Sequence, residues 1–384
     1  MSEAGVYLHV PFCAHRCHYC DFNTYTGLDD LIGRYVAGLG ADLAAVAGAG
    51  PRAVAPPGAD VDDRWPTFTS VFVGGGTPTL LPPAELAGVL RRVRDLLPVA
   101  ADAEVTVEAN PETVTVAALA ELVDAGLTRL SMGAQSFASH VLAFLGRRHD
   151  PERPLRAVAD ARSAGVSQVS LDLIYGAPAE AGADWAATLD TAVAAGLDHV
   201  SAYALTLEPT TGYAARVRAG TAAAPDDEVA GARMAVADAR LTAAGFERYE
   251  ISNWARPGRA CRHNLGYWRG GNWLGVGAGA HGHWAGRRWW SLRSPARYAD
   301  AALAGRTTTS GAEVLDDDAR RCERLMMGLR LSEGVARTAV EPIDEAGAGA
   351  AVRAGLLDDD GRRLRLTAAG RPLAGGVILR LLAA

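Results

Sequence analysis

The feature that constrains the fold most is a short junction that recurs four times in the first two thirds of the chain. Each time, an alanine and a glycine follow an alanine-rich helical stretch, and an apolar residue then opens a strand-like run. The four glycines are Gly126, Gly165, Gly196 and Gly245. Glycine readily takes the left-handed conformation that ends many helices, so the repeat indicates helix-to-strand units.

The sequence contains six strand candidates, and helical stretches separate them. The candidates are residues 6–10, 70–73, 104–108, 128–133, 168–175 and 200–205. Alternating strands and helices imply parallel strands, in an open doubly wound sheet or a barrel. Six units favour an α/β fold with a partial (β/α)6 barrel of the TIM type. From about residue 311 short helices and the turn at Asp359, Asp360 and Gly361 predict a small winged-helix-like domain. We therefore expect a core barrel over residues 1–240, an extension over 241–310 and a C-terminal domain over 311–384.

Composition excludes several classes of function. A formal charge of -6 with 21% charged residues gives no electrostatic reason to expect a nucleic-acid partner. The chain contains no lysine, which excludes a Schiff-base lysine and a Walker-type phosphate loop. No secretory signal is visible, and no window reaches the roughly 18 uncharged apolar residues of a spanning helix. We expect a cytoplasmic protein without a transmembrane segment, for which peripheral membrane contact stays open.

Three of the five cysteines, Cys13, Cys17 and Cys20, crowd into eight residues immediately after the first strand. This C-x3-C-x2-C spacing argues for a metal site in a reducing compartment rather than a disulfide framework. Three thiolates can hold an iron–sulfur cluster and leave one iron open, because such cubes normally take four cysteines. The same spacing also allows a structural zinc site completed by His9, His15 or His18.

Polar or unusual residues lie where the next strands end. Glycines 74–76 follow the second strand, Glu108 ends the third, Gln135 follows the fourth and Asp172 lies within the fifth. Ligands of such barrels meet the loops at the carboxyl ends of the strands. The glycine loop can bring backbone amides close to a carboxylate. A turn, an N-cap or a buried ion pair would explain any one of these residues alone.

The motifs resemble the HemN/HemW branch of radical-SAM proteins. The resemblance is carried by residues 7–13, the three cysteines, residues 74–79, 108–112, 132–137 and 172–176, in that order. It implies a radical-SAM barrel and a 4Fe-4S cluster on the three cysteines, with S-adenosylmethionine on the open iron. The implied contacts of S-adenosylmethionine are Tyr7, Tyr19, Gly75, Gly76, Thr77, Glu108, Gln135, Arg147, Asp172 and Ala204. Arg148 stands beside Arg147 and competes for its place.

Two activities exist within this branch. The oxygen-independent coproporphyrinogen III dehydrogenases typically carry a fourth cysteine two residues after the third, where this chain has Phe22, and a longer segment ahead of the cluster. Both departures favour the HemW-type haem chaperones, which pass haem to acceptor proteins. That resemblance does not require radical catalysis, and it assigns no catalytic residue.

The segment from Cys261 to Trp268 contains the H-N-x-x-Y-W sequence of the chaperones, which makes His263 a candidate haem ligand. Six of the eight tryptophans fall nearby and could pack against a porphyrin, at positions 254, 268, 273, 284, 289 and 290. The alternative is that His263 is a hydrogen-bonded core residue and that the tryptophans fill a core.

Overall fold

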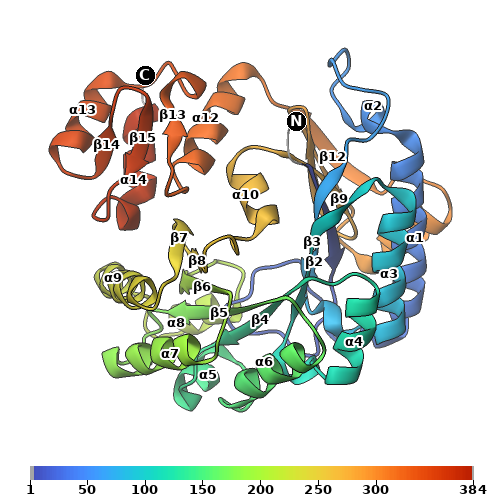
Figure 1. The fold of residues 1–384 in the computed structure, drawn as a ribbon, viewed down its shortest axis with the longest axis horizontal. Helices are drawn as coiled ribbons and strands as arrows, with labels where there is room; N and C mark the ends of the chain where they lie inside the picture. Colours follow the sequence, from blue (N-terminus) through green and yellow to red (C-terminus); the bar gives the residue numbers. More distant parts are fainter. Residues whose placement is uncertain (1–3, 383–384) are drawn as a thin grey trace.

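Six neighbouring parallel strands form the centre of the structure, a computed structural model that describes residues 4–382 (Figure 1). They lie in chain order, so each strand pairs with the next. This confirms the partial barrel predicted from the sequence, with every expected strand present. The strands are β1 (Ala4–Val10), β2 (Phe68–Gly75), β3 (Val99–Ala109), β4 (Arg129–Gln135), β5 (Gln168–Tyr175) and β6 (His199–Ala204).

Helices connect these strands and cover the outer side of the curved sheet (Figure 1). Gly126, Gly165, Gly196 and Gly245 have φ of 102°, 86°, 68° and 82°, the left-handed values that the recurring junction predicts. The main connecting helices are α1 (Ile32–Ala49), α3 (Pro83–Leu96), α4 (Val116–Asp124), α6 (Arg153–Ser163), α7 (Gly182–Ala194) and α9 (Asp227–Ala243). Shorter helices are α2 (Pro51–Val54), α5 (Ser139–Leu145) and α8 (Gly212–Arg218).

One stretch, Asp29–Ala49, is long and apolar enough to span a membrane by length and composition alone. It contains α1, whose residues Tyr35, Leu39 and Leu43 are buried in the main hydrophobic core. The helix packs against α3 and against α11 (Pro295–Leu303). Helix α1 thus packs on the outside of the barrel, like the other helices that connect its strands.

Additional strands extend the sheet at both edges, which the sequence did not predict. Strand β9 (Asn272–Val276) pairs in parallel with β1, and β10 (His281–Trp284), β11 (Arg287–Ser291) and β12 (Thr309–Val314) follow it antiparallel. At the other edge, β8 (Asn253–Ala255) and β7 (Glu247–Glu250) pair antiparallel beyond β6. Residues 241–310 thus share the sheet of the barrel, and the proposed boundaries near 240 and 310 stay predictions.

The C-terminal residues build a second, smaller core. Leu325, Val340, Leu364 and Leu381 are buried together, separately from the main core. This domain combines a three-stranded antiparallel sheet with three helices, the architecture expected of a winged-helix-like unit. Its elements are α12 (Asp317–Gly328), β13 (Val335–Ala336), α13 (Glu345–Arg353), β14 (Leu357–Asp359), β15 (Arg363–Leu366) and α14 (Ala374–Leu382).

Helix α10 (Arg262–Trp268) lies on the inner side of the curved sheet, opposite α1 and α3 (Figure 1). The carboxylate of Glu104, on β3, accepts hydrogen bonds from the backbone N–H groups of Arg262 (3.1 Å) and His263 (3.3 Å). A carboxylate at this helix N-terminus satisfies donors that the helix itself leaves free. The polar side chain of Glu104 therefore anchors the H-N-x-x-Y-W segment inside the barrel.

Candidate functional site

The three neighbouring cysteines lie on the loop that follows β1, with free, partly exposed thiols. Burial raises the pKa of the Cys13 thiol to about 11, and it also raises the pKa of Cys20. Thiolates in such a place need a positive partner, which iron would supply. Within residues 4–382, no three His, Cys, Asp or Glu side chains converge as ligands of a single metal ion would. In a cubane cluster each thiolate instead binds a different iron.

Of the three histidines that could complete a zinc site, His9 has both ring nitrogens bonded and His18 has one of them bonded. The His9 ring nitrogens bond the Tyr7 hydroxyl (2.9 Å) and the Asn23 carbonyl (3.0 Å), and His18 Nδ1 bonds the Phe144 carbonyl (3.0 Å). Only the third candidate, His15, has a buried ring nitrogen without a partner among the described residues. What speaks against the zinc alternative is that no three His, Cys, Asp or Glu side chains of the described residues converge on one point, as the ligands of a zinc ion would.

A chain of hydrogen bonds joins two of the cysteines across three loops. The Thr77 hydroxyl donates to Cys13 Sγ (3.7 Å) and accepts from Asn110 Nδ2 (2.9 Å). On the other side, Arg147 donates through Nη2 to Asn110 Oδ1 (2.9 Å) and through Nη1 to Cys17 Sγ (3.5 Å). Asn110, which the sequence analysis did not single out, is the link between them. Donors aimed at cluster sulfurs are among the groups that tune such centres.

Packing distinguishes Arg147 from the adjacent Arg148. Its side chain is buried and donates to the carbonyl of Gly133 (2.8 Å), whereas Arg148 is exposed. Burial lowers the pKa of Arg147, but interactions with Tyr19, Cys17 and Glu112 together raise it above its usual value. Arg147 therefore brings a fixed positive charge to the cysteine loop.

The glycine loop after β2 differs from the expectation. The Gly75 N–H donates to Glu108 Oε2 (3.0 Å). The Gly76 N–H donates to the Val10 carbonyl (2.8 Å), and the Thr77 N–H donates to the Phe12 carbonyl (2.8 Å). These amides are thus not free for a carboxylate. The glycines serve close packing instead, since a Cβ on Gly75 would lie 2.3 Å from the His9 ring and one on Gly76 would lie 2.5 Å from the Phe12 carbonyl.

Gln135 ends β4 in the left-handed region, with φ of 65°, and is buried. Such a conformation costs energy in a residue with a side chain, and strained residues of this kind cluster at functional sites. Its neighbour Gly133 makes room for it, because a Cβ there would lie 2.6 Å from Gln135 Nε2. The barrel thus holds Gln135 in a strained backbone conformation at the end of its strand.

Two carboxylates lie inside the barrel with raised pKa values. Burial raises the pKa of Glu108 to about 7, opposed by the hydrogen bond from Gly75 and helped by the charge of Asp172. Burial also raises the pKa of Asp172, although Ser201 and Ser131 donate hydrogen bonds to its carboxylate. Perturbed carboxyl groups in a lumen mark a candidate binding site.

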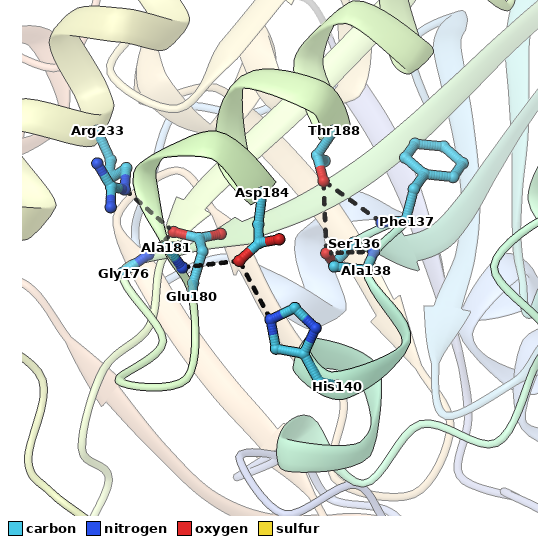
Figure 2. A network of polar contacts seen from close by, with 10 residues as sticks. All are labelled: Ser136, Phe137, Ala138, His140, Gly176, Glu180, Ala181, Asp184, Thr188 and Arg233. Atoms are coloured by element: carbon cyan, nitrogen blue, oxygen red, sulfur yellow. Dashed lines mark hydrogen bonds and ion pairs between the residues drawn. The ribbon is translucent and has the colours of Figure 1, made fainter.

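A polar network ties down the loops that follow β4 and β5 (Figure 2). Ser136 bonds Thr188 (3.4 Å), and the Asp184 carboxylate accepts from the Ala181 N–H (2.8 Å) and pairs with His140 (3.1 Å). In the same network Glu180 accepts from the Gly176 N–H (3.0 Å) and pairs with Arg233 (3.3 Å). The network stiffens the segment directly after Gln135.

A cavity of about 890 Å³ opens beside these strand ends. Tyr7, Gly75 and Glu108 line one part of it, whereas the other expected contacts of S-adenosylmethionine do not line it. Trp268, Trp273 and Trp290 line another part, with Phe22 and Met327, and we call this space the aromatic cavity. Tyr19 lies in the cysteine loop, and Asp172 and Ala204 lie on β5 and β6.

The tryptophans divide between the two interpretations that the sequence left open. Trp254, Trp284 and Trp289 are buried in the main core, whereas Trp268, Trp273 and Trp290 line the aromatic cavity. Half of the group therefore fills a core and half offers flat apolar surface to a ligand.

His263 takes the place of a hydrogen-bonded core histidine. It is buried, its Nδ1 bonds the Ser70 hydroxyl (2.9 Å), and its Nε2 bonds the Tyr267 hydroxyl (2.8 Å). Burial lowers its pKa to about 3, so the ring is neutral. In this arrangement both ring nitrogens are occupied, and the expected haem ligand offers no free nitrogen to iron.

Comparisons with known proteins agree with this geometry. The family model of the Radical SAM superfamily matches residues 7–192, and that of the HemN C-terminal domain matches residues 315–373. A protein named heme chaperone HemW from Mycobacterium tuberculosis is 47% identical over 382 residues, which cover 98% of this chain and 94% of that protein. The Escherichia coli protein of the same name is 36% identical, over 73% of this chain and 70% of its own length.

A mitochondrial relative and a solved structure extend the comparison. The radical S-adenosyl methionine domain-containing protein 1 of Bos taurus is 35% identical, over 90% of this chain and 72% of that protein. The structure of coproporphyrinogen III oxidase (HemN) from Escherichia coli superposes with a TM-score of 0.82 at 22% identity, over 99% of this chain and 90% of that one. That likeness shows the shared fold. The chain belongs to the radical-SAM superfamily, in the branch that contains the HemN and HemW proteins.

Proposed function

We propose that this protein is a cytoplasmic haem chaperone of the HemW type, which binds haem and passes it to acceptor proteins. The observation that carries the proposal is the aromatic cavity, which offers flat apolar walls beside the cysteine loop. Cavities of this size and lining are typical of cofactor sites. The names of the relatives in Mycobacterium tuberculosis and Escherichia coli support the same function.

Membership in the radical-SAM family implies a 4Fe-4S cluster and S-adenosylmethionine, and the residues present fit both. Cys13, Cys17 and Cys20 would hold the cluster, which when bound leaves one iron open to the cofactor. Glu108 and Asp172 suit an amino group or ribose hydroxyls as hydrogen-bond acceptors. The proposed contacts of S-adenosylmethionine are those that the resemblance implied: Tyr7, Tyr19, Gly75, Gly76, Thr77, Glu108, Gln135, Arg147, Asp172 and Ala204.

The branch also contains coproporphyrinogen III dehydrogenases, but nothing specific to this chain favours that activity. Phe22 stands at the position of their fourth cysteine, and 62% of its surface is exposed. It lines the aromatic cavity, where it adds apolar surface next to the cysteine loop. A side chain without a thiol at this place fits a binding role.

Two assays on one anaerobic preparation test the proposal. Titration with haemin, followed by the Soret absorption, should show saturable binding to the reconstituted protein. The same protein, supplied with coproporphyrinogen III, S-adenosylmethionine and a reductant, should form no protoporphyrinogen. Robust turnover would replace the chaperone by the dehydrogenase, and absence of haem binding would also refute the chaperone.

A further inference from the structure

We propose that haem sits in the aromatic cavity with His281 as the ligand of its iron. The assignment rests on the haem-binding function proposed above and places that function at a defined residue. His281 begins β10 and lines the aromatic cavity. Its side chain is exposed, and among residues 4–382 neither of its ring nitrogens has a hydrogen-bond partner.

His281 differs in this from the other histidines that line the cavities of this region. His9 has both ring nitrogens bonded, and His283 Nδ1 bonds the Gly271 carbonyl (3.0 Å). His263 is buried, does not line the aromatic cavity, and uses both nitrogens for Ser70 and Tyr267. A neutral imidazole with a free nitrogen is a common axial ligand of haem iron.

Partial burial and neighbouring positive charges both favour the neutral form of the His281 ring. Partial burial lowers the pKa of His281, and the nearby guanidinium groups of Arg288 and Arg293 lower it further. An unprotonated ring nitrogen can donate its lone pair to a metal. The same ring lies beside Trp290 in a stacked arrangement, with centroids 6.0 Å apart and planes inclined by 29°.

The surroundings suit the rest of a porphyrin. Trp273 and Trp290 present flat apolar surface, and Met327 comes from the C-terminal domain to close one side. At the rim, Arg293 donates to Asn23 Oδ1 (3.3 Å) and forms no ion pair with a carboxylate of the described residues. A guanidinium that has no carboxylate partner in the protein can form an ion pair with a propionate group of haem.

A second cavity of about 860 Å³ adjoins the first and suggests a route of release. It shares Tyr267, Trp273, His281 and Met327 with the aromatic cavity, so His281 stands at the junction of the two spaces. The His281 side chain is thus reached from both cavities. Haem can then be held from one side and approached by an acceptor from the other.

His263 takes a positioning role in this arrangement. It holds the Tyr267 hydroxyl at 2.8 Å, and the Tyr267 ring meets Trp273 edge to face, with centroids 4.6 Å apart. Loss of His263 would therefore loosen a wall of the cavity without removing an iron ligand. Replacement of His263 is expected to weaken haem binding while leaving the axial ligation signature intact.

The test compares haemin titrations of the reconstituted full chain and two variants. His281→Ala should raise the dissociation constant of haemin by roughly tenfold or more, because one iron–ligand bond is lost. The variant should also change the Soret absorption and the low-spin electron paramagnetic resonance signal. Free imidazole added to H281A should restore the native spectrum. The matched control is His140→Ala, since His140 is a surface histidine on α5, 55% exposed and paired with Asp184 (Figure 2).

The outcomes separate the two claims. Native spectra and affinity in H281A would refute His281 as ligand while leaving the haem-binding function intact. If the wild-type chain binds no haem, the proposed function itself fails. Loss of the haem spectrum in H281A that imidazole does not reverse, with the cluster absorption retained, would also overturn the ligand assignment. An equal loss in H140A would show that haem binds surface histidines without a defined site.

Discussion

Asn110 offers the sharpest test of how the barrel holds the cysteine loop. Replacement by leucine keeps the approximate volume and removes two hydrogen bonds, one from Asn110 Nδ2 to Thr77 and one from Arg147 Nη2 to Asn110 Oδ1, both 2.9 Å. A neutral bond contributes about 1 kcal/mol and a bond to a charged group about 1.5–3 kcal/mol. Asn110→Leu should therefore lower the free energy of unfolding by about 2–4 kcal/mol.

The measurement is urea unfolding of the apoprotein under anaerobic conditions, followed by circular dichroism. Iron and sulfide bound after reconstitution should fall in parallel, because Thr77 and Arg147 face Cys13 and Cys17. Asn264→Leu is the matched control, since within residues 4–382 the Asn264 side chain forms no hydrogen bond. A loss in N110L below about 0.5 kcal/mol, or no larger than in N264L, would refute the role of the link.

Further outcomes follow from individual groups. The pKa of Glu108 is about 7 in the folded protein and about 4.3 in the unfolded chain. Between these two pH values the carboxyl group is protonated only in the folded state, so the free energy of unfolding falls as pH rises. Glu108→Gln should remove this pH dependence, which is at most about 1.4 kcal/mol per pH unit. The measurement is the free energy of unfolding from pH 4.5 to 7.5, and an unchanged profile would argue against the raised pKa of Glu108. Gly75→Ala should lower the free energy of unfolding by at least about 2 kcal/mol, because alanine would be strained at this φ and its Cβ would meet the His9 ring. Gly88→Ala is the control and should not destabilise the protein, because a Cβ at Gly88 on α3 has open space around it. A G75A variant as stable as the native chain would show that the loop can relax.

The central barrel was predictable because local and global signals agree there. Glycines that end helices, apolar strand runs and polar residues at strand ends recur together along this part of the chain, and each predicted strand is present. The edge strands were not predictable, because β7, β8 and β10 are three or four residues long and gain their pairing from neighbours distant in sequence. Such strands carry too little periodicity of their own to be recognised.

Within the site, the sequence identified residue types but not their partners. It proposed Arg147 with Arg148 beside it as a competitor, and only packing shows that Arg147 is buried while Arg148 is exposed. It singled out His263 because of a motif, whereas the hydrogen bond that occupies Nδ1 of this ring comes from Ser70, which is distant in sequence. The free amides expected after β2 are likewise occupied, by the Glu108 carboxylate and by the carbonyls of Val10 and Phe12 ahead of the cysteine loop. Hydrogen-bond partners that come from distant segments leave no local pattern.

The measurement that tests the account most directly is electron paramagnetic resonance of the anaerobically reconstituted, reduced protein with and without S-adenosylmethionine. Three cysteine ligands and one open iron predict a 4Fe-4S signal whose g values shift when the cofactor is added. The signal should be lost in a Cys17→Ala variant. A cluster signal that S-adenosylmethionine leaves unchanged, or no cubane signal at all, would contradict the account.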